Sequence, residues 1–177
     1  MSEQPWRNPR PGPKLPEVQP RLSHLLIPQG LRSWWPALLC AVIISVLSTD
    51  RFSSEHTAVV FEKIFRWIIP SLTAGQFEII HYCIRKTSHL TEYFIFCVLL
   101  YRGIRADRQG WRWSWALAAL LAAACYSILD EVHQIFVPGR TASPYDSLLD
   151  SAGALIALAV LWFWFRRRKS ALQSERT

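Results

Sequence analysis

SLLDSAGALIALAVLWFWFRRRK, at residues 147–169, is the stretch that decides the fold. Its apolar part has about the length of 17 to 25 residues that a helix needs to cross the hydrocarbon core of a bilayer. Trp162 and Trp164 close the apolar part, and indole rings prefer the headgroup boundary. A basic cluster follows them, whereas a carboxylate, Asp150, lies near the other end. The stretch therefore predicts a membrane-spanning helix whose basic end is cytoplasmic.

Three further apolar runs have the same character. In a chain of 177 residues, 51% hydrophobic content and nine Trp argue against an ordinary soluble protein. We expect an all-α membrane protein, a bundle of four transmembrane helices plus one outer interfacial amphipathic helix. The four predicted spans cover about 34 to 48, 82 to 101, 113 to 129 and 147 to 165.

The basic residues fix the predicted topology. Most of them precede the first span, lie between the second and third, or follow the fourth, and these are alternate loops. The positive-inside rule then places both termini in the cytoplasm. The net charge of +7 is explained by this distribution, so we expect no nucleic-acid partner.

Outside the spans, three segments have distinct patterns. Residues 1–30 are rich in Pro and basic residues, which predicts a disordered cytoplasmic tail. The membrane domain then covers 31–169, and 170–177 form a second cytoplasmic tail. The apolar spacing that begins at Phe61 predicts the amphipathic helix, which lies in the outer interface and stops at Pro70.

A start signal for the next helix follows. Thr73 and Gln76 have the spacing of a capping box, so we expect a new helix to begin at Ala74 and to run into the second span.

Ionisable residues gather at one end of the predicted spans. A charge in hydrocarbon costs about 3 kcal/mol or more, so each must belong to a site or to a satisfied polar core. Spacing lets most members of each cluster share one helix face, and the topology puts all clusters on the outer side. We therefore expect a polar funnel open to that side. Its candidate residues are Lys86, His89 and Glu92, then Asp130, Glu131, His133 and Gln134, then Arg140, Asp146 and Asp150.

In an enzymatic version of this funnel, His89 or His133 is the general base. Glu92 or Asp130 is its partner or the proton donor. Arg140 suits a two-point grip on a phosphate or carboxylate. The remaining candidates for substrate binding are Lys86, Glu131, Gln134, Asp146 and Asp150.

Two other interpretations of the same residues stay open. The catalytic set could equally bind a divalent metal, although helical i, i+3 spacing is a weak metal signal and indicates no particular cofactor. Alternatively, the charges pair with one another as a structural network. Nearby, His81 is expected to face the outer headgroups, and the charge of Arg85 to reach the interface by snorkelling.

Three motifs resemble a known family. They are STDRFSSEHT at 48–57, RKTSHLTEY at 85–93 and DEVHQIFVPGR at 130–140, followed by Asp146 and Asp150. In order, spacing and placement they are similar to the VanZ-like membrane proteins over about residues 45 to 160. The resemblance implies a small multi-pass protein of the bacterial cytoplasmic membrane. The family that the chain resembles has a founding member associated with teicoplanin resistance. The resemblance implies no particular reaction.

The leading functional hypothesis is that the funnel binds, or acts on, the polar head of a membrane lipid or a lipid-linked cell-wall precursor at the outer leaflet. The main alternative is a non-catalytic scaffold whose polar network is paired internally. A proton-coupled transporter is a third possibility, since intramembrane carboxylates and histidines can relay protons. The residues contain no nucleophile motif, so they leave open whether the protein is an enzyme.

Overall fold

The computed structural model describes residues 29–49, 54–137 and 143–174, and in these ranges it contains helices and no strand. This confirms the all-α class. Nearly all of the predicted N-terminal tail, and Arg140, lie outside the described residues. The helices are α1 (Gln29–Leu47), α2 (Ser54–Ile68), α3 (Ala74–Arg105), α4 (Trp113–Ile135) and α5 (Pro144–Ser174).

The start of α3 follows the predicted capping box. The backbone N–H of Gln76 donates to Oγ1 of Thr73 over 3.3 Å, and the N–H of Thr73 donates to Oε1 of Gln76 over 3.1 Å. These bonds satisfy two N–H groups that a helix start otherwise leaves without a partner. The predicted helix start at Ala74 is therefore confirmed. The preceding helix, α2, ends at Ile68, before Pro70, as expected.

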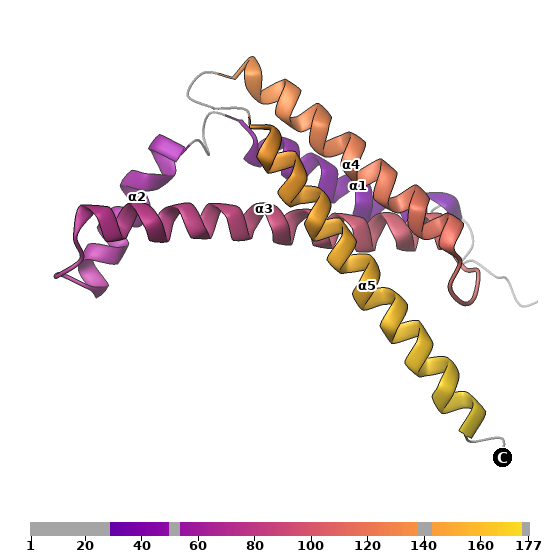
Figure 1. Ribbon diagram of the computed structural model, residues 1–177. Coiled ribbons are helices and arrows are strands. Elements are labelled where there is room, and N and C mark those ends of the chain that lie inside the picture. Colours follow the sequence, from indigo (N-terminus) through magenta and orange to yellow (C-terminus); the bar gives the residue numbers. More distant parts are fainter. Residues whose placement is uncertain (1–28, 50–53, 138–142, 175–177) are drawn as a thin grey trace, which may run out of the picture.

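Helix α3 is the axis of the molecule. Its middle and C-terminal parts pack against α1, α4 and α5, whereas its N-terminal part runs out to one side and contacts α2 (Figure 1). Helix α5 crosses α3 and its C-terminal half projects beyond the other helices (Figure 1). Phe65 of α2 packs edge-on against Phe77 of α3, with their ring centroids 6.4 Å apart. The apolar face of α2 thus rests on α3.

Small residues allow the close crossing of α3 and α5. Ala154 and Ala157 of α5 are fully buried, as are Ala119 and Ala123 of α4. A Cβ at Gly153 would clash with the backbone carbonyl of Leu90 in α3. Small side chains at helix crossings let backbones approach in this way in membrane proteins. The crossing at Gly153 brings the polar start of α5 against α3.

Two helices in the described part of the chain are long and apolar enough to cross a membrane. They are α4, over Trp113–Ile135, and α5, over Pro144–Ala171. The apolar part of α1, Arg32–Leu47, is shorter. Large hydrophobic side chains such as Leu121 and Leu155 are more than half exposed on these helices, as expected for surfaces in contact with lipid. Two of the four predicted spans thus have support from length and composition.

Candidate functional site

The start of α5 is tied to α3 and α4 through carboxylates. Lys86 of α3 forms a salt bridge with Asp146, in the first turn of α5. One turn later, Oδ2 of Asp150 accepts a hydrogen bond of 2.7 Å from Ser127 of α4. The other oxygen of Asp150 lies 3.3 Å from Nδ1 of His89 in α3. Asp150 is 1% exposed, so its charge is compensated inside the protein.

A second set of contacts surrounds the C-terminal end of α4. Oδ2 of Asp130 accepts hydrogen bonds from Ser48, over 2.7 Å, and from Gln134, over 3.0 Å. The backbone N–H of Ser143 donates to Glu131 over 2.7 Å. Asp130, Glu131 and Gln134 are all buried. Each of these three side chains has a partner, although Oε1 of Glu131 is buried without one among the described residues.

We call these neighbouring sets of paired side chains the polar network. Most of the predicted site residues belong to it. Its members are Ser48, Lys86, His89, Ser127, Asp130, Glu131, Gln134, Asp146 and Asp150.

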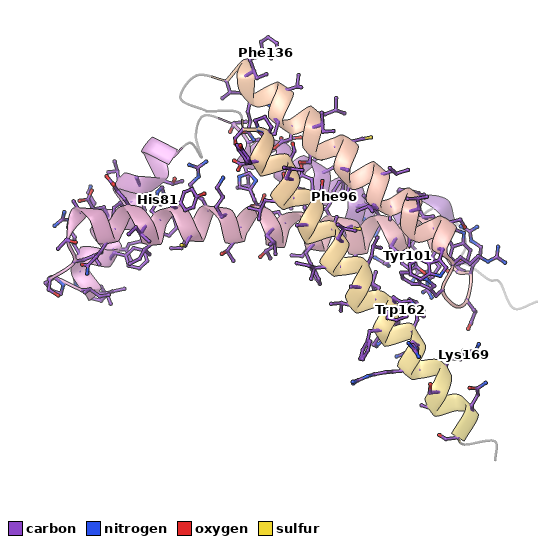
Figure 2. All side chains as sticks on the ribbon, in the orientation of Figure 1. His81, Phe96, Tyr101, Phe136, Trp162 and Lys169 are labelled. Carbon is purple, nitrogen blue, oxygen red and sulfur yellow. The ribbon has the colours of Figure 1, made fainter. Side chains whose placement is uncertain are left out.

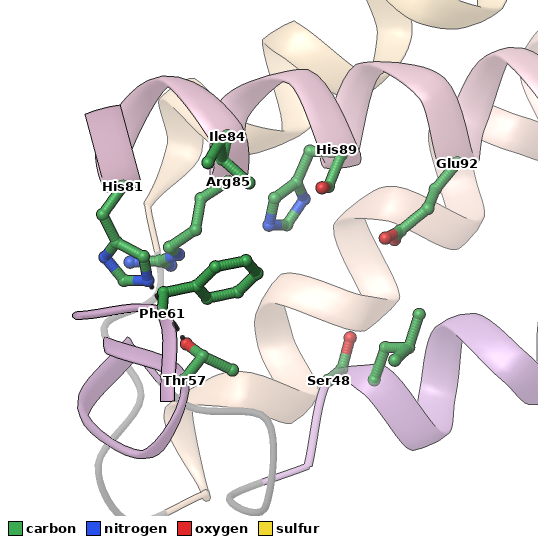
Figure 3. A pocket seen from close by; sticks show the side chains of 10 residues that line it. Ser48, Thr57, Phe61, His81, Ile84, Arg85, His89 and Glu92 are labelled. Carbon is green, nitrogen blue, oxygen red and sulfur yellow. Dashed lines mark hydrogen bonds between the residues drawn. The ribbon is translucent and has the colours of Figure 1, made fainter. Parts of the chain in front are cut away.

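A cavity of about 150 Å³ lies beside the network, between α1, α2 and α3. Figure 3 shows the side chains that surround it. Its polar wall comes mainly from one face of α3, with His81, Arg85, His89 and Glu92. Ser48, directly after α1, closes one side, and we call this space the Arg85 cavity.

The size of the Arg85 cavity limits what can enter. A water molecule takes about 30 Å³ of liquid, so the space corresponds to about five waters. Pockets for whole drug-sized ligands are larger, about 300 to 1,000 Å³. A phosphate or carboxylate group fits such a space, and the rest of its molecule would lie outside.

His89 links the cavity to the network. Because its Nδ1 faces the buried carboxylate of Asp150, Nε2 is the ring nitrogen that a group in the cavity would meet. His89 therefore contacts the buried carboxylate of Asp150 on one side of its ring and lines the cavity as well.

His81, at the outer end of the cavity wall, is packed between aromatic rings. Its ring stacks on Phe77 at 5.7 Å between centroids and lies 5.9 Å from that of Phe61. Burial, together with the nearby charge of Arg85, lowers the pKa of His81 below its ordinary value of 6.5. His81 is therefore neutral near pH 7, with Thr57 as its neighbour at 3.4 Å.

The structure separates the predicted site residues into groups. His89 and Glu92 line the Arg85 cavity. His133 is exposed on the last turn of α4 and does not line that cavity, and Arg140 lies outside the described residues. In the described ranges, no cluster of three or more His, Cys, Asp or Glu is placed to hold a metal ion.

Arg85 is the residue that the sequence interpretation undervalued. Its side chain is half-buried in the cavity wall. The signal was in the spacing, because Arg85, Ser88, His89 and Glu92 follow at i, i+3, i+4 and i+7 and share a helix face.

The model of the VanZ/LLP1 family matches residues 33–166 of this chain. The chain belongs to the VanZ/LLP1 family. This confirms the resemblance seen in the sequence, and it supports a membrane protein linked to glycopeptide resistance. No curated protein and no solved structure matches the chain.

The matched region of this VanZ/LLP1 chain contains both the polar network and the Arg85 cavity. The network joins α3, α4 and α5 through ion pairs and hydrogen bonds. The cavity is lined by a guanidinium, two imidazoles and a carboxylate. Such a mixed set of donors and one acceptor suits an anionic group that also carries a hydroxyl or an amine.

Proposed function

We propose that this protein is a multi-pass protein of the bacterial cytoplasmic membrane, and that the Arg85 cavity binds the anionic head of an envelope lipid or a lipid-linked cell-wall precursor. The observation that carries the proposal is the convergence of Arg85, His89 and Glu92 on a cavity beside a network of paired charges. A half-buried arginine that lines a cavity, next to carboxylates that are already paired, favours an anionic ligand.

The proposed topology has four spans with both termini in the cytoplasm. The alternate basic loops support it, since the loop between α3 and α4 and the C-terminal end of α5 are both rich in arginine. With this orientation the Arg85 cavity opens toward the outer leaflet. Helix α2, amphipathic and strongly exposed at Trp67, would lie in the outer interface beside it.

Each cavity side chain has a role in the proposed binding. Arg85 grips a phosphate or carboxylate through two parallel N–H groups. Nε2 of His89 adds a hydrogen bond, while Nδ1 lies 3.3 Å from the carboxylate of Asp150. Glu92 accepts a hydrogen bond from a hydroxyl or amine of the same headgroup. Binding alone can alter the envelope, so the proposal requires no reaction.

A specific observation also favours a second function, that of a non-catalytic scaffold. Lys86, Asp130, Asp146 and Asp150 all have partners within the protein. In this alternative the charges define one helix arrangement, and another protein or lipid is recognised elsewhere on the surface.

The test compares two arginines. Arg85→Gln removes the charge in the cavity wall, whereas Arg66→Gln removes an exposed arginine of α2 that pairs with Glu62 at 2.8 Å, away from the cavity. Each full-length variant is produced in a glycopeptide-susceptible bacterium. Teicoplanin susceptibility is then measured, and the pools of lipids and cell-wall precursors are profiled.

We expect wild type and Arg66→Gln to change susceptibility or the precursor pools to the same extent, and Arg85→Gln to have no effect at an equal protein level. If Arg85→Gln behaves as wild type, the cavity is not the binding site and the scaffold function stands.

A further inference from the structure

A second cavity lies at the end of the bundle away from Arg85. It has a volume of about 730 Å³ and is formed by the loop after α3 together with the C-terminal half of α5. Four basic residues line it, which are Arg105, Arg166, Arg168 and Lys169. We call it the basic pocket. Figure 2 shows Trp162 and Lys169 on the part of α5 that projects from the bundle.

An apolar groove adjoins the basic pocket. It has a volume of about 580 Å³ and runs between α4 and α5, where Leu117, Leu120, Leu155 and Leu158 line it. Trp162 lines both the groove and the pocket. A molecule with a charged end and an apolar chain could therefore occupy both spaces at once.

The arginines of the basic pocket are held on aromatic rings. The guanidinium of Arg168 lies 4.0 Å from the ring centroid of Trp164, that of Arg166 lies 5.4 Å from Trp162, and that of Arg105 lies 5.3 Å from Phe165. Across the described residues, none of these three arginines forms a salt bridge with a carboxylate. Stacking positions a guanidinium and leaves the N–H groups at its edge able to bind an anion.

We propose that this end of the protein binds one anionic phospholipid, with its phosphate in the basic pocket and one acyl chain in the apolar groove. The inference is independent of the proposed function of the Arg85 cavity. Charge complementarity selects the occupant, since a basic pocket that shares Trp162 with an apolar groove matches an anionic head joined to a hydrocarbon chain. A second copy of the chain would bring like charges together.

The test uses the full-length protein in detergent micelles and native mass spectrometry. Phosphatidylglycerol is the probe, and phosphatidylcholine and inorganic phosphate are compared with it. Arg168→Gln removes a basic side chain of the pocket, whereas Arg167→Gln removes the neighbouring charge, which stacks on Phe163 and lines neither cavity.

We expect one retained phosphatidylglycerol on the wild type and less phosphatidylcholine. Arg168→Gln should lower the affinity about five-fold, because one basic residue contributes about 1 kcal/mol to binding an anionic lipid. Arg167→Gln should have a smaller effect, and Arg168→Lys should restore most of the binding. If Arg168→Gln does not fold, Lys169→Gln tests the same pocket.

The groove is tested separately. Ala159→Trp fills the groove, whereas Ala118→Trp adds the same side chain at an exposed site of α4 that lines neither space. Only Ala159→Trp should reduce retention of phosphatidylglycerol. The proposal is overturned by equal retention of the two phospholipids, by equal losses in Arg167→Gln and Arg168→Gln, or by inorganic phosphate displacing the lipid at similar concentration.

Discussion

Arg85 and Lys86 are adjacent basic residues on α3, yet they meet different surroundings. Lys86 faces the start of α5 and forms a salt bridge with Asp146, whereas Arg85 turns about 100° around the helix and lines a cavity. The charge of Lys86 is paired inside the protein, whereas Arg85 lines a cavity that a ligand can enter. The polar network and the Arg85 cavity therefore have different consequences when they are mutated, the first for stability and the second for binding.

The largest effect should come from removing one member of the ion pair. Asp146→Ala leaves the ammonium of Lys86 partly buried without its carboxylate, at a cost of up to about 3 kcal/mol. Thermal unfolding in detergent measures the loss. The double variant Lys86→Met with Asp146→Leu should recover most of it, because it removes both charges at once. Equal stability of Asp146→Ala and wild type would contradict this prediction.

The close crossing of α3 and α5 should show the next largest effect. Gly153→Ala forces the two helices apart, because its Cβ would meet the carbonyl of Leu90, and overpacking of this kind costs about 1 to 3 kcal/mol. The shift also moves Asp150 away from His89. Gly75→Ala is the matched control, since no atom outside its own helix lies within 4 Å of the added Cβ.

Both variants can be followed by thermal unfolding. A stability loss in Gly75→Ala that equals the loss in Gly153→Ala would show that the crossing is not tightly packed at this glycine.

The third largest effect should be a difference in stability between two serine-to-alanine variants. Ser127→Ala removes the buried hydroxyl that donates to Asp150, which should cost about 1 to 3 kcal/mol, since a buried acceptor loses its partner. Ser88→Ala removes an exposed hydroxyl from the wall of the Arg85 cavity and should change stability by less than about 0.5 kcal/mol. The same unfolding assay compares them. Equal losses would mean that the cavity and the network are one structural unit.

The sequence predicted the helices well because their signals are local. Apolar length, the capping box at Thr73 and the stop before Pro70 all act within a few residues. Each predicted helix is present, although α2 begins at Ser54, before the apolar spacing that predicted it. It was harder to predict which polar residues belong to the polar network and which line the Arg85 cavity. Which face of α3 meets α5 depends on the crossing at Gly153, a contact between residues far apart in the chain.

The candidate site shows the same limit. Sequence spacing grouped Lys86 with His89 and Glu92, but it could not tell that Lys86 is paired with α5 while Arg85 lines the cavity. His133 shares a helix face with Asp130 by spacing, yet it is exposed. Helical spacing alone predicts which side chains lie on the same broad face of a helix. Packing against other helices decides which of them are buried.

The smallest effect concerns pH and the contact between α2 and α3. The pKa of His81 is lowered by burial and by Arg85. His81 therefore takes up a proton less readily when α2 is packed on α3 than when α2 has detached. The contact is therefore fully favoured above about pH 6.5, and it weakens as the pH falls toward the lowered pKa. Hydrogen exchange of α2 should accelerate modestly on acidification in wild type. His81→Gln keeps a polar side chain without this titration, so an unchanged pH dependence in that variant would assign the effect to another group.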